Sequence, residues 1–241
     1  MAMNRTDKIQ NFLKHHINNK KAILGVSGGI DSSLVLMLLK NSIQPDQIMA
    51  VFMPEIYTSE KDKNDIIQLE NASGIPIKNV YIDNFVKSYE SILEIKDKKL
   101  LGNIKSRIRM TILYYFANKE QGIVVGTTNL TEYITGYYTK FGDGGCDIEP
   151  LLQSTKTDVR SMSKEIGVPL PIIRKLPSAG LWTDQYDERE LGFSYDELDS
   201  EIEYFLSNKK FNDSIAGRKL KSLYENSAHK RVMPPRPEMD L

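Results

Sequence analysis

The chain has 241 residues, of which 40% are hydrophobic and 27% charged, a composition that predicts one large globular domain with a sizeable core. Lysine plus arginine and aspartate plus glutamate each number 32, so no net basic field attracts nucleic acid, which argues against a tRNA-modifying enzyme. One cysteine, Cys146, excludes an internal disulfide and a cysteine-rich metal site, and the lack of a signal core or a long apolar span predicts a cytoplasmic protein.

Apolar segments alternate with helical patterns along the first half of the chain. After a helix near 4–19, we predict strands at 21–26, 48–53, 78–82 and 122–126, with helices at about 31–40, 60–72, 84–94 and 103–118. This alternation predicts a Rossmann-like, doubly wound α/β fold, a parallel sheet flanked by helices. No repeat or linker interrupts it, so we expect a single domain over 1–241. Ligands should gather beyond the carboxyl ends of the strands, where the turns after Val26 and Val125 meet.

The first of these turns reads Ser27-Gly28-Gly29-Ile30-Asp31-Ser32 and joins an apolar strand to an apolar helix. Its glycines allow a sharp turn close to a ligand, and the following helix N-terminus favours phosphate. Asp31 would repel a phosphate unless a divalent cation lay between them, so the turn predicts a metal–nucleotide site. The spacing matches neither a Walker A loop nor G-x-G-x-x-G. The alternative is a plain glycine-rich turn in which serines only cap the helix.

The second turn, Gly126-Thr127-Thr128-Asn129-Leu130-Thr131-Glu132, follows the strand 123–125. Its threonines can donate hydrogen bonds to a nucleotide, and Glu132 can supply a second hard oxygen ligand to a metal shared with Asp31. A capped helix with a solvated glutamate explains this spacing equally well. The nearby segment 139–147, Thr-Lys-Phe-Gly-Asp-Gly-Gly-Cys-Asp, is too rich in glycine for a core element and predicts a mobile, functional loop.

Several segments together resemble one family. The turn 27–32 resembles the S-G-G-x-D-S signature of the PP-loop ATP pyrophosphatases, and the segments 102–110, 126–151, 191–196 and 229–231 resemble motifs of the ammonia-dependent NAD synthetases, in the same order, between about residues 22 and 234. Three positions depart from the family pattern: Ala228 for the usual Glu, Ser178 for the usual Thr and Gly180 for the usual Asp.

The resemblance implies a ligase that forms a C–N bond. It would convert deamido-NAD, ATP and ammonia into NAD, AMP and pyrophosphate through an adenylated intermediate, with Mg²⁺ as the cofactor, and would work as a homodimer. No protein nucleophile is needed, so the enzyme's work is positioning and electrostatics.

The resemblance also assigns residues to each substrate. For ATP it implies Gly25, Val26, Ser27, Gly28, Gly29, Ile30, Asp31, Ser32, Thr127, Lys156 and Ser178; for deamido-NAD it implies Arg107, Lys140, Asp147, His229 and Lys230; for Mg²⁺ it implies Asp31 and Glu132. Electrostatic roles in catalysis would fall to Asp31, Lys140 and Lys156. Taken alone, a residue such as Arg107 or Lys156 is more often a solvated surface charge.

Three alternatives remain beside this interpretation: another PP-loop adenylating amidotransferase, a tRNA-modifying enzyme, or a non-catalytic adenine-nucleotide sensor. We expect no glutaminase domain in 241 residues, so free ammonia would be the nitrogen donor. Met110, Ile112, Leu113 and Phe116 in the helix 103–118 fit either core or a subunit interface, and the resemblance favours an interface. Cys146 is expected to be exposed, without a role.

Overall fold

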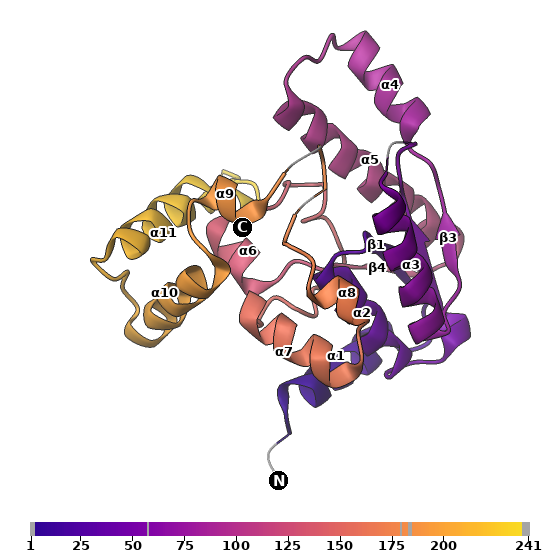
Figure 1. The fold of residues 1–241 in the computed structure, drawn as a ribbon, viewed down its shortest axis with the longest axis horizontal. Helices are drawn as coiled ribbons and strands as arrows, with labels where there is room; N and C mark the ends of the chain where they lie inside the picture. The colour runs from indigo at the N-terminus through magenta and orange to yellow at the C-terminus, as the bar shows by residue number, and fades with distance from the viewer. Residues whose placement is uncertain (1–2, 57, 179, 183–184, 238–241) are drawn as a thin grey trace.

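The computed structural model describes residues 3–56, 58–178, 180–182 and 185–237 and contains a four-stranded parallel sheet in the order β3-β2-β1-β4 (Figure 1). The strands are β1 (Ala22–Val26), β2 (Ile48–Phe52), β3 (Ile77–Asn79) and β4 (Ile123–Val125). Leu24 pairs with Ala50 of β2 on one side and with Val125 of β4 on the other. The predicted Rossmann-like α/β class is confirmed.

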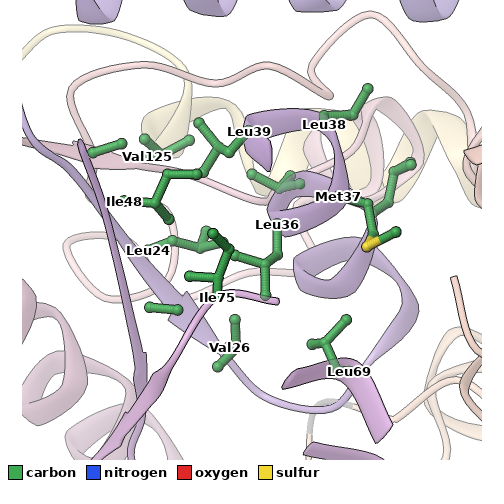
Figure 2. Close-up of a cluster of buried hydrophobic side chains, with 14 of the residues drawn as sticks. Leu24, Val26, Leu36, Met37, Leu38, Leu39, Ile48, Leu69, Ile75 and Val125 are labelled. Carbon is green, nitrogen blue, oxygen red and sulfur yellow. The ribbon is translucent and has the colours of Figure 1, made fainter. Parts of the chain in front are cut away.

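One face of the sheet is covered by α1 (Arg5–Ile17), α2 (Ile30–Lys40), α3 (Glu60–Ser73), α7 (Lys156–Ile166) and α8 (Leu170–Ile173). Side chains alternate along β1, so Leu24 and Val26 point into this layer. Figure 2 shows them among side chains from α2, α3 and the neighbouring strands. Because α2 packs its whole length here, the turn before it is held rigidly against the sheet.

The other face carries α4 (Asp83–Ile92) and α5 (Lys98–Lys119), which pack on Ile23, Val51 and Val124. In α5, Phe116 is buried and the half-buried Leu113 and Ile112 pack against the same cluster, so these three residues contribute to the core. Met110 lies outside this cluster, and a subunit interface along α5 stays a prediction. The helix also begins earlier than predicted, at Lys98, because the Asp97 carboxylate accepts hydrogen bonds from the first backbone N–H groups.

A third cluster lies apart from the sheet and was not predicted. It joins α6 (Leu130–Thr135), α9 (Asp187–Leu191), α10 (Tyr195–Asn208) and α11 (Ile215–Asn226) around Leu198, Ile202 and Leu220. Figure 1 shows α10 and α11 side by side, on the opposite side of the molecule from α3 and α4. Among the described residues, two short 3-10 helices are also present, η1 (Pro45–Gln47) and η2 (Ala228–Lys230).

The predicted strand 78–82 is shorter than expected. β3 ends at Asn79, although the Ile82 N–H still donates to the Pro54 carbonyl, because Ile82 becomes the N-cap of α4.

Within the described ranges, no helix has both the length and the apolar character needed to cross a membrane.

Candidate active site

The turn between β1 and α2 forms a glycine-rich loop at the carboxyl edge of the sheet. Gly28 has φ +75°, a left-handed conformation that side chains disfavour, so the turn requires glycine there. The Ser27 and Ser32 hydroxyls lie 3.2 Å apart, and Ser33 Oγ donates to the Gly29 carbonyl over 2.8 Å. Among the described residues no side chain caps the start of α2, which leaves its first N–H groups available to an anion.

Asp31, Glu132 and Lys156 come together beside this loop. Lys156 Nζ lies 2.6 Å from Asp31 Oδ2 and 3.2 Å from Glu132 Oε1, and the lysine side chain is only 3% exposed. Three elements supply them, since Asp31 lies in the first turn of α2, Glu132 lies in the first turn of α6 and Lys156 is the first residue of α7. The two predicted turns therefore meet at one edge of the sheet, as expected, and Lys156 is no solvated charge.

Helix capping fixes the acidic groups in place. Asn129 is the N-cap of α6: its side-chain oxygen accepts from the Glu132 N–H, while its own backbone N–H donates to Glu132 Oε2 over 3.1 Å. The Asn129 amide also donates to Asp31 Oδ1 over 2.8 Å. Glu132 is thus both a helix cap and a neighbour of Asp31, so the plain capping interpretation and the functional one describe the same residue.

The cluster pairs one ammonium group with two carboxyl groups. Burial raises the pKa of the Glu132 carboxyl; Lys156 opposes this shift and Asp31 adds to it. Burial disfavours the charged lysine, but Asp31 and Glu132 outweigh it and raise the pKa of Lys156. Lys156 therefore stays positively charged, and a further cation beside Glu132 would favour its ionised form.

This donor set fits a hard divalent cation shared with a polyphosphate. Mg²⁺ is commonly held by one or two carboxylates, with phosphate oxygens and water filling its octahedron, and Asp31 and Glu132 offer two carboxylates. In the part of the chain that the structure describes, no three histidine, cysteine or acidic side chains gather to hold a metal by themselves. The residues thus fit an ion that arrives with its phosphate ligand.

A second site lies at the end of the loop 137–145, against the C-terminal tail. A cavity of about 330 Å³ is lined by Tyr133, Tyr138, Lys140, Phe141, Gly144, Lys230, Arg231, Val232, Met233 and Pro234. Lys230 Nζ donates to the Gly136 and Tyr138 carbonyls at 2.7 and 2.5 Å, and Lys140 Nζ donates to the His229 carbonyl. Burial lowers the pKa of Lys230. Cations and aromatic faces together suit a ligand with phosphates and planar rings.

The other residues predicted to bind deamido-NAD do not all lie in one place. Arg107 is exposed and donates to the Lys140 carbonyl, and His229 meets Lys140 through its backbone, so both border the second site. The Asp147 carboxylate instead accepts from the Val124 N–H and the Tyr114 hydroxyl, at the edge of β4.

Thr127 lies in the turn that follows β4, two residues before the Asn129 cap. Ser178 is exposed and accepts from the Gly180 N–H. Within the described residues, Ser178 makes no hydrogen bond with Asp31 or Lys156, although the segment that carries it starts beside the glycine loop.

That start is fixed by Lys175, which sequence analysis missed. Its ammonium group lies 3.1 Å from the buried Asp65 carboxylate and 2.5 Å from Asp62, and it approaches the Gly28 carbonyl at 3.4 Å. These contacts tie the segment after α8 to α3 and to the glycine loop. Residues more than a hundred positions apart form this cluster, and none of the motifs covers it.

Glu149 was also missed, and it corrects the expectation for Cys146. The thiol is half-buried against the α4–α5 core cluster and hydrogen-bonds to Glu149, and burial raises the pKa of Cys146, so it is not the exposed cysteine that we expected. Burial likewise raises the pKa of Glu149 to about 7. Its carboxylate accepts from the Thr128 N–H beside Gly126, where a Cβ would lie 2.4 Å from the carboxyl carbon.

Comparison with known proteins adds an independent finding. The family model described as NAD synthase matches residues 3–234. The NH3-dependent NAD⁺ synthetase of Picrophilus torridus is 49% identical over 94% of this chain and 91% of its own length. Among solved structures, the NMN synthetase of Francisella tularensis has a TM-score of 0.88 at 31% identity, over 98% of both chains. The NH3-dependent NAD synthetase of Campylobacter jejuni has a TM-score of 0.84 at 26% identity, over 98% of this chain and 100% of that one.

Proposed function

This chain belongs to the NAD synthase family, and we propose that it forms NAD by joining ammonia to the nicotinate carboxyl of deamido-NAD at the expense of ATP. The observation that carries the assignment is the Asp31–Lys156–Glu132 cluster, which lies beside an uncapped helix start at the carboxyl edge of the sheet. Such a cluster suits a polyphosphate, since it offers a positive charge, backbone N–H donors and two carboxylates that can hold a divalent cation.

We assign the ATP site to this cluster. The loop 25–32 would surround the phosphates with N–H and hydroxyl donors, while the Lys156 ammonium would stabilise negative charge that develops on the phosphate during adenylation. Thr127 lies within the same edge and Ser178 follows Lys175, which supports a contact of each with the nucleotide. Asp31 and Glu132 would hold Mg²⁺, and the chemistry that a bound divalent cation supplies here is neutralisation of the polyphosphate charge.

We assign the second site to deamido-NAD. Lys140 and Lys230 lie in one cavity with the rings of Tyr133, Tyr138 and Phe141, an arrangement that supports binding of a dinucleotide's phosphates and aromatic rings. Arg107 and His229 lie at its border. Asp147, held at the edge of β4 by two hydrogen bonds, would act on the dinucleotide only if a segment rearranged on binding.

We propose a reaction in two steps, which these positions would support. A nicotinate carboxylate oxygen attacks the α-phosphorus of ATP, so a C–O–P bond forms while the bond to pyrophosphate breaks. Ammonia then attacks the acyl carbon, AMP leaves with the bonding electron pair, and the nitrogen loses a proton. The side chains orient the two substrates and stabilise charge in both steps.

The test is a product assay with purified protein, ATP, Mg²⁺, ammonium and deamido-NAD. We expect NAD, AMP and pyrophosphate in equal amounts, whereas ADP in place of AMP, or no NAD, would contradict the proposal. A second arm substitutes nicotinate mononucleotide for deamido-NAD, because one structural neighbour is named an NMN synthetase. A larger kcat/KM in that arm would reassign the acceptor while leaving the adenylation chemistry intact.

We also propose that the enzyme is a homodimer. The helix α4 and its flanks carry several large exposed apolar side chains: Tyr81, Phe85, Tyr89, Ile92 and Leu93. An apolar patch of this kind is commonly covered in an assembly. A cytoplasmic location stays a prediction, which fractionation of the producing cell would test.

A further inference from the structure

Asp199 is a buried carboxylate in α10 that neither substrate site uses. It is 3% exposed, and its two oxygens contact the starts of α6 and α7, two of the three helices that carry the Asp31–Lys156–Glu132 cluster. Oδ1 accepts from Thr131 Oγ1 at 2.5 Å, and Oδ2 accepts from the backbone N–H and the hydroxyl of Thr157 at 2.8 and 2.7 Å.

These contacts continue to the cluster around ATP. Thr131 Oγ1 accepts from the Lys156 backbone N–H over 3.0 Å, so one hydroxyl links Asp199 to the first residue of α7. Thr131 directly precedes Glu132, and Thr157 directly follows Lys156. Asp199 therefore contacts a sequence neighbour of Glu132 and a sequence neighbour of Lys156, but neither of these two side chains itself.

The same face of α10 also contacts the Lys156 side chain. Tyr195 lies four residues before Asp199, one helical turn away, and its buried ring faces Lys156 Nζ at 4.9 Å from the ring centre. The helix α10 thus contacts the ammonium of Lys156 directly through Tyr195 and reaches its backbone through Thr131. A buried negative charge is tolerated here because the N–H groups in the first turn of α7 stabilise it.

We propose that Asp199 is a positioning residue that sets the distance between Glu132 and Lys156 by tying the starts of α6 and α7 to α10. The inference rests on the proposed function, because the distance between Glu132 and Lys156 matters for catalysis only if this cluster binds ATP. A carboxylate suits this position because three donors converge on its two oxygens. An asparagine replaces one of these acceptors by an NH₂ group, so either Thr131 or Thr157 loses its acceptor. Loss of such a supporting hydrogen-bond partner typically lowers activity or metal affinity by about 10–100-fold.

The experiment compares Asp199→Asn with wild type in steady-state kinetics and in calorimetric titration with ATP and Mg²⁺. We expect kcat to fall by about 10–100-fold and ATP to bind at least about tenfold more weakly. KM for deamido-NAD should stay within about twofold, because the second site makes no contact with Asp199. In a Thr131→Val background, Asp199→Asn should have a much smaller effect, since the two residues act in one chain of contacts.

Glu201→Gln is the matched control. Glu201 lies on the same helix and is also partly buried, but its carboxylate accepts from Ser214 and Asn212 at the start of α11, away from the site. It should leave kcat and ATP binding unchanged. The inference is overturned if Asp199→Asn keeps wild-type kcat and ATP affinity, or if Glu201→Gln loses as much. If wild type makes no NAD, the proposed function fails, whereas the ATP titration still tests Asp199.

Discussion

Lys156 is the buried cation on which the electrostatics of the proposed ATP site depend. It is nearly inaccessible to water, contacts two carboxylates and lies over the ring of Tyr195. Removing it leaves Asp31 and Glu132 close together without their cation, which costs stability as well as function.

Replacement of Lys156 by methionine keeps the length of the side chain and deletes the charge. We expect kcat to fall by about 100-fold or more, since loss of one preorganised donor to developing charge has that effect. Measured NAD formation and urea denaturation would separate the functional loss from the destabilisation. Lys164→Met, on an exposed position of the same helix, should change neither quantity, and an active Lys156→Met enzyme would contradict the assignment.

Glu149 predicts a pH dependence of stability. Burial raises its pKa in the folded protein from 4.5 to about 7, while the unfolded chain ionises near the ordinary value. Between these two values the folded state binds more protons, so the free energy of unfolding falls as pH rises through this window. Glutamine resembles the protonated acid and does not titrate.

Glu149→Gln should therefore gain stability relative to wild type as pH rises from 5 to 8, by roughly 2 kcal/mol. Urea denaturation at both pH values measures this difference. Glu203→Gln, at an exposed position on α10, is the control for the substitution itself. An unchanged difference for Glu149→Gln would mean that the carboxyl ionises normally.

At the scale of elements, the end of α6 depends on a close approach that only glycine allows. Gly136 has φ +69°, and a Cβ there would lie 2.1 Å from Ser227 Cβ, just before η2. The contact brings the C-terminal tail against α6, where Lys230 donates to the Gly136 carbonyl. A larger residue would displace the tail and with it one wall of the second site.

Gly136→Ala should therefore destabilise the protein by more than the free energy needed to hold an alanine at a positive φ. It should also raise KM for deamido-NAD. Gly74→Ala is the matched control, because Gly74 ends α3 at φ +67° with nothing within 4 Å of a new Cβ. Each substitution pays about 1 kcal/mol for the left-handed backbone, so the excess measures the Ser227 contact. If both variants lowered the melting temperature equally and KM were unchanged, the tail would move to accommodate the new Cβ without affecting the second site.

The helices and strands differ in how well the sequence predicts them. The strands β1, β2 and β4 were predicted because buried parallel strands are short apolar runs between turns, and their turns carry the motifs that met at Asp31 and Glu132. The cluster of α6, α9, α10 and α11 was missed because no strand alternates with these helices. Lys175 and Asp199 were missed for a related reason: each acts through contacts with residues distant in sequence, which no local pattern encodes.

Over the whole molecule, the two proposed substrate sites depend on different layers. The proposed ATP site is built on the sheet and its packed helices, whereas the second site joins α6, the loop 137–145 and the tail. Figure 1 shows the α4–α5 pair extending from the sheet on the side away from α10 and α11. An assembly through α4 would therefore leave the α10–α11 pair in solvent.

This geometry predicts the oligomeric state and a pair of substitutions that test it. Wild type should elute as a dimer in size-exclusion chromatography with light scattering. Ile92→Glu, in the apolar patch of α4, should shift the protein toward monomer, because burying an unpaired carboxylate at an interface is unfavourable. Ile92 is 78% exposed, and Ile215 on α11 is 74% exposed, so Ile215→Glu makes the same change outside the patch and should leave a dimer. If both variants and wild type were monomers with equal activity, the exposed face of α4 would have no role in assembly.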